Sequence, residues 1–169
     1  MSDQNLFAEQ FRLLHVRGKP LVLFNAWDAG SARAVAAGGA KAIALGSWSV
    51  AAAHGYEDGE RVPFDFVIDN LKRIVGSVEL PVSIDLESGY GETPADVGRS
   101  VARVIEAGAI GCNLEDSFPQ DGSLREPADG ARRIARARVA AESAGIPFFI
   151  NARTDDFMQT PRANHDLAL

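Results

Sequence analysis

Two acidic residues, Asp85 and Glu87, stand two positions apart where an apolar run typical of a buried strand gives way to a glycine-containing turn. Side chains at positions i and i+2 of a strand point to the same side of the sheet, so both carboxylates are expected to project toward one point. Two like charges placed together need a cation between them. The pair therefore predicts a cation site at the end of this strand.

Further acids follow other apolar runs along the chain. Asp58, Glu115 and Asp116 each come just after such a run. Any one of these acids is equally well explained as a helix cap or a solvated turn residue, but their grouping at successive strand ends favours a metal. Oxygen donors without sulfur favour a hard cation, Mg2+ or Mn2+, over zinc, and Mg2+ retains waters that bridge to some acids. The candidate ligands are Asp58, Asp85, Glu87 and Glu115.

Residues suited to an anionic ligand also lie at predicted strand ends. Arg153 can bind a carboxylate or phosphonate through two parallel hydrogen bonds, and an ion pair with Asp155 or Glu115 is the alternative. The turn at residues 46–48 offers backbone N–H groups and a hydroxyl to an anion, although a tight turn with a core tryptophan would have the same sequence. Tyr90 either lines the site or packs over its mouth. A dication beside these groups could hold a 2-oxo acid and stabilise its enolate.

About five apolar runs alternate with helical patterns and position these residues. The runs lie at residues 21–24, 42–45, 81–85, 109–114 and 147–152. Helices are expected at about 29–38, 63–77, 93–107 and 127–144, with a leading helix over 3–16. Alternating strands and helices, with polar residues at the carboxyl end of each strand, predict a parallel βαβ architecture.

Two closures of such a sheet are possible, an open doubly wound sheet and a (β/α)8 barrel. The first turn, at residues 25–28, lacks the glycines of a doubly wound nucleotide site, and charged residues gathered at successive strand ends favour the barrel. A full barrel takes roughly 250 residues, so the 169 residues of this chain supply only the first five units. We therefore expect a partial barrel domain over 1–158 and an unpatterned, truncated end at 159–169.

Composition restricts the classes of protein to consider. With 46% hydrophobic and 24% charged residues, the chain has the make-up of one globular domain. Its net charge of -6, without a Lys/Arg cluster, argues against nucleic-acid binding. It has neither a signal peptide nor an apolar run of about 18 residues, so no membrane association is expected. The single Cys112 fits a reducing compartment, and we expect a cytoplasmic protein.

Five motifs in a fixed order carry a resemblance to a known family. They are Phe24–Asp28, Gly55–Gly59, Asp85–Gly91, Asn113–Ser117 and Asn151–Asp155. In these motifs, and over residues 5 to 158, the chain resembles the isocitrate lyase and phosphoenolpyruvate mutase superfamily. The resemblance implies a Mg2+-dependent (β/α)8 barrel that cleaves or forms carbon-carbon or carbon-phosphorus bonds in small 2-oxo and 2-hydroxy acids through an enolate-like intermediate. Its members are commonly tetramers, which leaves a homo-oligomer open.

The resemblance also implies roles for individual residues. By position, the four candidate acids match the family's metal acids, some of them acting through water, and Arg153 matches its substrate-binding arginine. Residues 46–48 match its carboxylate-binding loop. The predicted substrate-binding residues are Gly46, Ser47, Trp48, Tyr90 and Arg153, and the predicted catalytic residues are Asp58 and Arg153.

The chain departs from the family pattern in three ways. Glu87 stands where Asp is usual, and its extra methylene is expected to shift the metal or admit a different water. Residues 117–126 contain none of the Cys and His of the lid in isocitrate and methylisocitrate lyases, which argues against those two activities. Strands six to eight are absent. A phosphonopyruvate or carboxyphosphonoenolpyruvate type of reaction, an oxaloacetate-type cleavage or another 2-oxo acid lyase remains.

The alternative function belongs to a different class of protein. A truncated and catalytically inactive fragment would act at most as a binding or interaction module. Five of eight units leave an open sheet edge and exposed apolar helix faces, which predict aggregation or pairing with a second copy.

Overall fold

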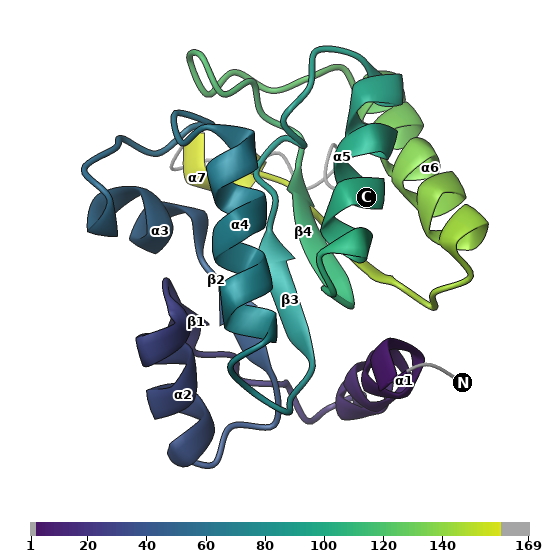
Figure 1. Cartoon of the computed structure of the whole chain (residues 1–169). Coiled ribbons are helices and arrows are strands. Elements are labelled where there is room, and N and C mark those ends of the chain that lie inside the picture. Colours follow the sequence, from purple (N-terminus) through teal and green to yellow (C-terminus); the bar gives the residue numbers. More distant parts are fainter. Residues whose placement is uncertain (1–2, 160–169) are drawn as a thin grey trace.

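Five parallel strands form one sheet in which each strand pairs with the next along the chain, in the order β1-β2-β3-β4-β5 (Figure 1). The strands are β1 Asn25–Ala26, β2 Ile43–Leu45, β3 Val82–Asp85, β4 Gly111–Glu115 and β5 Phe149–Arg153. A doubly wound sheet reverses its strand order at a switch point, whereas a barrel does not. The order confirms the predicted partial (β/α)8 architecture. The computed structural model describes residues 3–159, so all of the predicted end segment except Gln159 lies outside the described residues.

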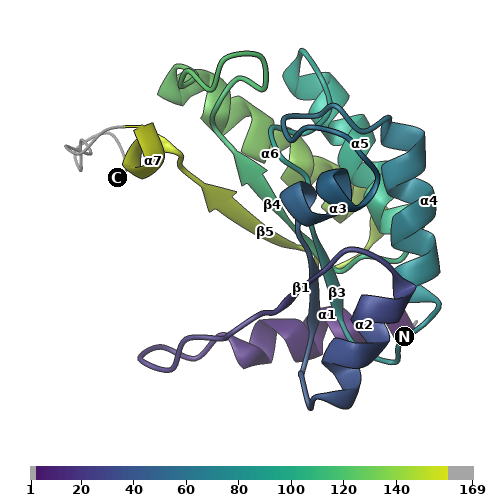
Figure 2. The same cartoon turned by 90° about the vertical axis from the view of Figure 1, so that its left-hand side faces the viewer.

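Helices cover one side of the sheet and leave the other side bare (Figure 2). The helices are α1 Asp3–Leu14, α2 Ala29–Ala37, α3 Ser47–Ala53, α4 Phe64–Val75, α5 Pro94–Glu106, α6 Pro127–Ala144 and α7 Asp156–Gln159. Two of them start at side-chain caps. The Asp28 carboxylate accepts from the Ser31 N–H at 2.6 Å ahead of α2, and the Thr93 hydroxyl accepts from Asp96 ahead of α5.

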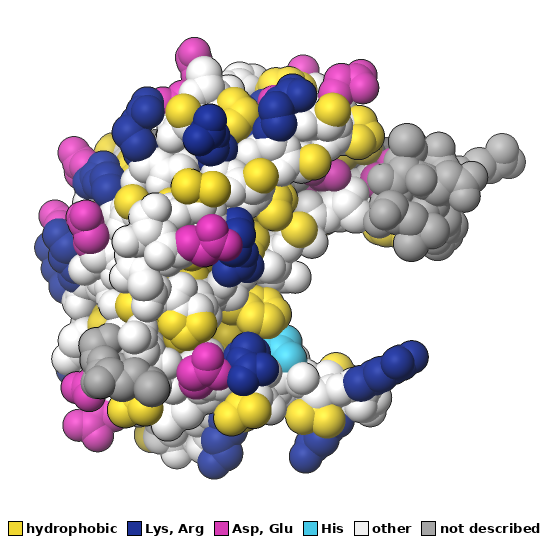
Figure 3. Space-filling model, turned by 90° about the vertical axis from the view of Figure 1, so that its right-hand side faces the viewer, with side chains coloured by type: hydrophobic (Ala, Val, Ile, Leu, Met, Phe, Trp, Pro, Cys, Tyr) yellow, Lys and Arg dark blue, Asp and Glu magenta, His cyan; other side chains and the backbone are white. Residues whose placement is uncertain are grey.

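The two faces of the sheet carry different residues because side chains alternate along each strand. Ile84, Cys112 and Leu114 face the helices and are almost completely buried in the main core. The register pairs Asp85 with Asn113 and Glu115 with Arg153, which places these polar side chains together on the bare face. Figure 3 shows that the molecule is hollowed on this side. Burial raises the pKa of the Cys112 thiol to about 12, so the thiol is protonated and unreactive at neutral pH.

Helix α1 closes the end of the sheet at which the strands begin. Ala8 and Phe11 pack with Ala42 and Ile110 in a second core cluster. The Gln4 amide donates to the carbonyl oxygens of Ile105 and Ala109 at 2.8 Å, which ties α1 to the end of α5 and to the segment before β4. The predicted leading helix is thus confirmed, at the end of the sheet away from the polar residues.

The structure corrects two local predictions. The strand predicted at 21–24 is displaced to Asn25–Ala26, and Val22 and Phe24 are 70% and 62% exposed. Within residues 3–159 no second strand lies beside this segment, so its backbone pairs only with β2. The turn predicted at 46–48 is instead the start of the short helix α3, which its alanines favour. Among the described residues, no helix is long and apolar enough to cross a membrane.

Candidate functional site

A cavity of about 550 Å3 lies at the carboxyl ends of the strands. Its lining includes nearly every predicted site residue, namely Gly46, Ser47, Trp48, Asp58, Asp85, Glu87, Glu115 and Arg153, together with Asn25, Gly59, Ser117, Phe118, Pro119 and Asp155. Tyr90 is not part of this lining and borders a smaller neighbouring pocket. The cavity is the natural position for a ligand site, because strand ends of a barrel converge there.

Arg153 is the centre of the charged side chains in the cavity. Its guanidinium lies 2.6 Å from the Glu115 carboxylate, 3.0 Å from that of Asp155 and 3.7 Å from that of Asp85. The pairing of Glu115 with Arg153 across β4 and β5 brings the first contact about directly. The ion pairs considered as the alternative role of Arg153 are therefore present in the structure, while a role in substrate binding stays a prediction.

Asp155 is a site residue that the sequence pattern did not single out beyond its pairing with Arg153. Its carboxylate accepts from the Ser117 hydroxyl at 2.5 Å as well as from Arg153. Its backbone N–H donates to the Asp116 carboxylate at 2.9 Å, so Asp116 helps to position Asp155. Its place at the end of β5, after Arg153, was the available signal, because that end faces the same cavity as β3 and β4.

The site holds more negative than positive charge. Burial, followed by the charge of Asp85, raises the pKa of Glu115 to about 8, although Arg153 opposes the shift. Burial also raises the pKa of Asp85. Burial lowers the pKa of Arg153, but the nearby carboxylates outweigh it and the pKa is raised. One guanidinium therefore neutralises the buried acids only in part.

The donor chemistry around Asp85 fits a hard dication. With Asp85, Glu115 and Asp155 ionised, three negative charges surround the one positive charge of Arg153. Among the described residues, Asp85 accepts hydrogen bonds from the Ser47 hydroxyl and from the Glu87 N–H, both long at 3.2 Å. Within residues 3–159 no three His, Cys, Asp or Glu side chains gather closely enough to form a complete ligand set. The residues fit a cation that retains waters, as Mg2+ does.

Glu87 is arranged differently from the other acids. One carboxylate oxygen accepts from the N–H groups of Gly59 and Glu60, at 2.9 and 2.6 Å, and the other accepts from the Tyr90 hydroxyl at 2.8 Å. Burial raises the pKa of Glu87. The Tyr90 ring stacks on Phe64 at 4.8 Å, so its hydroxyl is fixed toward Glu87. The metal role of Glu87 and the substrate role of Tyr90 stay predictions.

The residues at 46–48 lie at the start of α3 and border the cavity. A larger residue would not fit at Gly46 unless Asn25 moved, because a Cβ there would come within 2.8 Å of the Asn25 amide nitrogen. Ser47 reaches Asp85, and Trp48 is 70% exposed rather than part of the core. Asp58 is exposed at the cavity rim, on the segment between α3 and α4. Both groups are thus placed beside the buried acids, as the sequence predicts.

Comparisons with known proteins agree with this architecture. A family model for phosphoenolpyruvate phosphomutase matches residues 11–169. An uncharacterized protein of Mycobacterium tuberculosis H37Rv is 36% identical over 147 residues, covering 87% of this chain and 53% of its own length. The 2-methylisocitrate lyase of Escherichia coli K12 is 30% identical over 151 residues, covering 86% and 51%. The chain therefore spans about half the length of the curated relatives it matches.

A solved structure is also similar. A protein described as a phosphonomutase from Burkholderia cenocepacia J2315 is 56% identical and superposes with a TM-score of 0.93, over 97% of this chain and 67% of that chain. The relatives thus include enzymes of the lyase and mutase type. The chain belongs to the phosphoenolpyruvate phosphomutase family, within the isocitrate lyase and phosphoenolpyruvate mutase superfamily.

Proposed function

We propose that this chain forms the cation- and substrate-binding part of a Mg2+-dependent lyase or mutase that acts on a small 2-oxo or 2-hydroxy carboxylic acid. The observation that carries the proposal is the convergence of Asp85, Glu115 and Asp155 on Arg153 inside a cavity at the strand ends. Buried acids in excess over one guanidinium are the environment in which a dication binds. A cavity of about 550 Å3 is large enough for a small acid.

In this proposal the acids bind Mg2+ in two ways, directly or through water. Asp85 is the direct ligand, since it is buried and its hydrogen bonds are weak, while Glu115 and Asp58 act through bound waters. Mg2+, when bound, supplies electrophilic stabilisation to an enolate oxygen of the substrate. Arg153, whose side chain is 34% exposed, pairs with the substrate's carboxylate or phosphonate group.

The loop after β4 bears on the choice of substrate. Phe118 and Pro119 of this loop border the cavity, and residues 117–126 contain no Cys or His that could transfer a proton. We therefore propose a phosphonopyruvate or carboxyphosphonoenolpyruvate type of reaction, or an oxaloacetate-type cleavage, rather than isocitrate or methylisocitrate cleavage. The similarity to a phosphonomutase supports this choice. We propose a cytoplasmic location, for which the single buried Cys112 is suited.

Metal titration tests the proposal directly. Isothermal calorimetry with Mg2+, or electron spin resonance with Mn2+, should show binding to the unaltered chain. Asp85→Ala should abolish that binding, because it removes the proposed direct ligand. Asp69→Ala, which removes an exposed acid on α4, is the matched control and should bind like the unaltered chain. Absence of binding, or binding unchanged in Asp85→Ala, would remove the mechanism.

A second function, as an interaction module, is favoured by the edges of the sheet. Within residues 3–159, β1 and β5 each pair with a strand on one side only. Val22 and Phe24 are exposed beside β1. Unpaired strands with apolar neighbours pair readily with another chain, including a second copy. Size-exclusion chromatography with light scattering should then report a dimer or larger species, and a monomer at all concentrations would exclude this function.

A further inference from the structure

Three residues with unusual backbone geometry lie where two loops of the site meet. Glu60, Glu87 and Tyr90 are the non-glycine residues with positive φ among those that the structure describes, at 58°, 52° and 50°. This left-handed conformation is unfavourable for a residue that carries a side chain. Glu60 belongs to the segment that follows Asp58, and the other two belong to the loop after β3. Contacts between the two loops must therefore maintain this geometry.

A glutamate side chain of each loop accepts hydrogen bonds from the other loop. One oxygen of Glu87 accepts from two successive backbone N–H groups, those of Gly59 and Glu60. Successive N–H groups of this kind form a concave site for an anion. In return, one oxygen of Glu60 accepts from the Ser88 hydroxyl at 2.7 Å and from the Tyr90 N–H at 2.8 Å. We refer to these contacts among Gly59, Glu60, Glu87, Ser88 and Tyr90 as the loop clasp.

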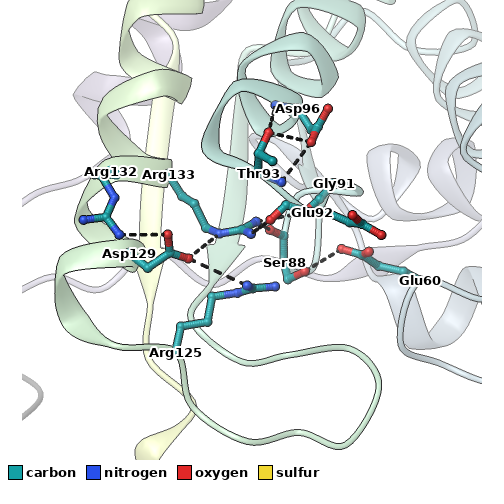
Figure 4. Close-up of polar contacts among 10 residues, drawn as sticks. All are labelled: Glu60, Ser88, Gly91, Glu92, Thr93, Asp96, Arg125, Asp129, Arg132 and Arg133. Atoms are coloured by element: carbon teal, nitrogen blue, oxygen red, sulfur yellow. Dashed lines mark hydrogen bonds and ion pairs between the residues drawn. The ribbon is translucent and has the colours of Figure 1, made fainter.

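The loop after β3 is fixed from its other side by α6. Arg133 is 1% exposed, and its guanidinium donates to the carbonyl oxygens of Gly91, Ser88 and Glu92. Asp129 accepts from the Arg133 Nε at 2.9 Å and orients it. Figure 4 shows Arg133 reaching this loop from one side and Glu60 bonded to Ser88 from the other. The loop after β3 is thus the fixed partner, and the segment with Asp58 is held to it.

We propose that Glu87 is a positioning residue: within the loop clasp, it holds the segment that carries Asp58 against the strand end that carries Asp85. Three protein donors already engage its two oxygens, which favours a positioning role over direct ligation of the cation. The length of the side chain explains why Glu stands here. Asp would be shorter by one methylene, roughly 1.5 Å, and could not keep the contacts at 2.6 and 2.9 Å. The inference rests on the proposed function for the cation, whereas the clasp stands on its contacts alone.

Two substitutions at one position separate a positioning role from direct ligation. Glu87→Gln keeps the side-chain length and a carbonyl oxygen for the Gly59 and Glu60 N–H groups. Glu87→Asp keeps the charge and loses the reach. For a positioning residue, Glu87→Asp should accelerate hydrogen exchange of both amides about tenfold, while Glu87→Gln leaves exchange close to that of the unaltered chain. Mn2+ affinity should follow the same order, with the Asp variant the weaker.

Glu60 provides a second and independent measurement. Glu60→Ala removes the other half of the clasp without touching Asp85, and should weaken Mn2+ binding about as much as Glu87→Asp. The double variant should cost no more than either single one, because both break the same unit. Glu57→Ala, an exposed acid of the same segment, is the control and should change neither exchange nor affinity.

The opposite results would overturn the inference. If Glu87→Gln weakens Mn2+ binding more than Glu87→Asp does, with amide exchange unchanged, Glu87 is a cation ligand. If neither variant changes the exchange of Gly59 and Glu60 relative to amides of α4, the clasp does not hold the segment. If the unaltered chain binds no Mn2+, the proposed function fails, whereas amide exchange still decides whether Glu87 positions the segment. Circular dichroism of each variant identifies any that does not fold.

Discussion

At the scale of residues, the buried carboxylates that are proposed to bind the cation are expected to destabilise the folded chain when no cation is present. Asp85→Asn removes a charge that burial disfavours while keeping an oxygen for Ser47 and Glu87. Without divalent cations, this variant should unfold at a temperature higher by about 2 °C or more. Thermal melts followed by circular dichroism in a chelating buffer check this. An unchanged or lower midpoint would show that the carboxylate of Asp85 is well compensated in the folded chain.

The pKa of Glu115 predicts how stability depends on pH. Its folded pKa, about 8, lies above the usual carboxyl value of 4.5, so the folded chain holds a proton that the unfolded chain releases between these limits. The contribution to stability is fully present below pH 4.5 and is lost as the pH rises toward 8. Urea unfolding in a chelating buffer should show this decline. Glu115→Gln should flatten it, and Mg2+ should oppose it because the cation favours the ionised carboxylate.

At the scale of elements, α6 stabilises the loop after β3 through Arg133. Arg133→Ala leaves three loop carbonyl groups without their donor and removes the main partner of Asp129. We expect a loss of about 3 kcal/mol in the free energy of unfolding. Arg132→Ala, one position away with a side chain 64% exposed, should cost less than about 0.5 kcal/mol. Equal urea midpoints for the two variants would contradict the role of Arg133.

The same elements show what local sequence predicts well. Helix α6 has the predicted bounds because Pro127 suits a first helical turn and Gly145, at φ 67°, ends the helix in the left-handed conformation. Strands β2 to β4 are recognisable because most of their residues are buried and turn signals bound them. The strand predicted at 21–24 is displaced, since strand pairing depends on a neighbour that the local pattern does not reveal.

The candidate site is predictable to a different degree. Asp85, Glu115 and Arg153 could be predicted to share one cavity, because each lies at the carboxyl end of a parallel strand and these ends meet at one edge of the sheet. Position at a strand end does not reveal which donors a carboxylate accepts hydrogen bonds from. Glu87 accepts from amides 27 and 28 positions earlier in the chain, and these N–H groups converge only because Gly59 and Glu60 have positive φ. That geometry depends on tertiary contacts.

At the scale of the whole molecule, the exposed apolar residues beside β1 predict self-association. Val22→Lys together with Phe24→Lys places charges along this edge, and charged edges oppose strand pairing between chains. We expect the mass measured by light scattering to fall toward that of a monomer. Val139→Lys, at a 49% exposed position on α6, is the control and should leave the mass unchanged. An equal effect of both changes would indicate non-specific association rather than pairing at β1.

The position of Cys112 has a practical consequence. It is the single thiol of the chain and is 0% exposed between the sheet and the helices, so a thiol reagent can reach it only after these layers separate. The rate at which Cys112 is labelled then reports how often the core opens. If this rate does not depend on the reagent concentration, opening itself is rate-limiting, whereas a rate proportional to the concentration indicates that opening and closing are faster than labelling. Cation or substrate analogue that binds the folded chain should lower that rate in proportion to its affinity. Labelling of Cys112 can therefore measure ligand binding to the unaltered chain, without an introduced cysteine.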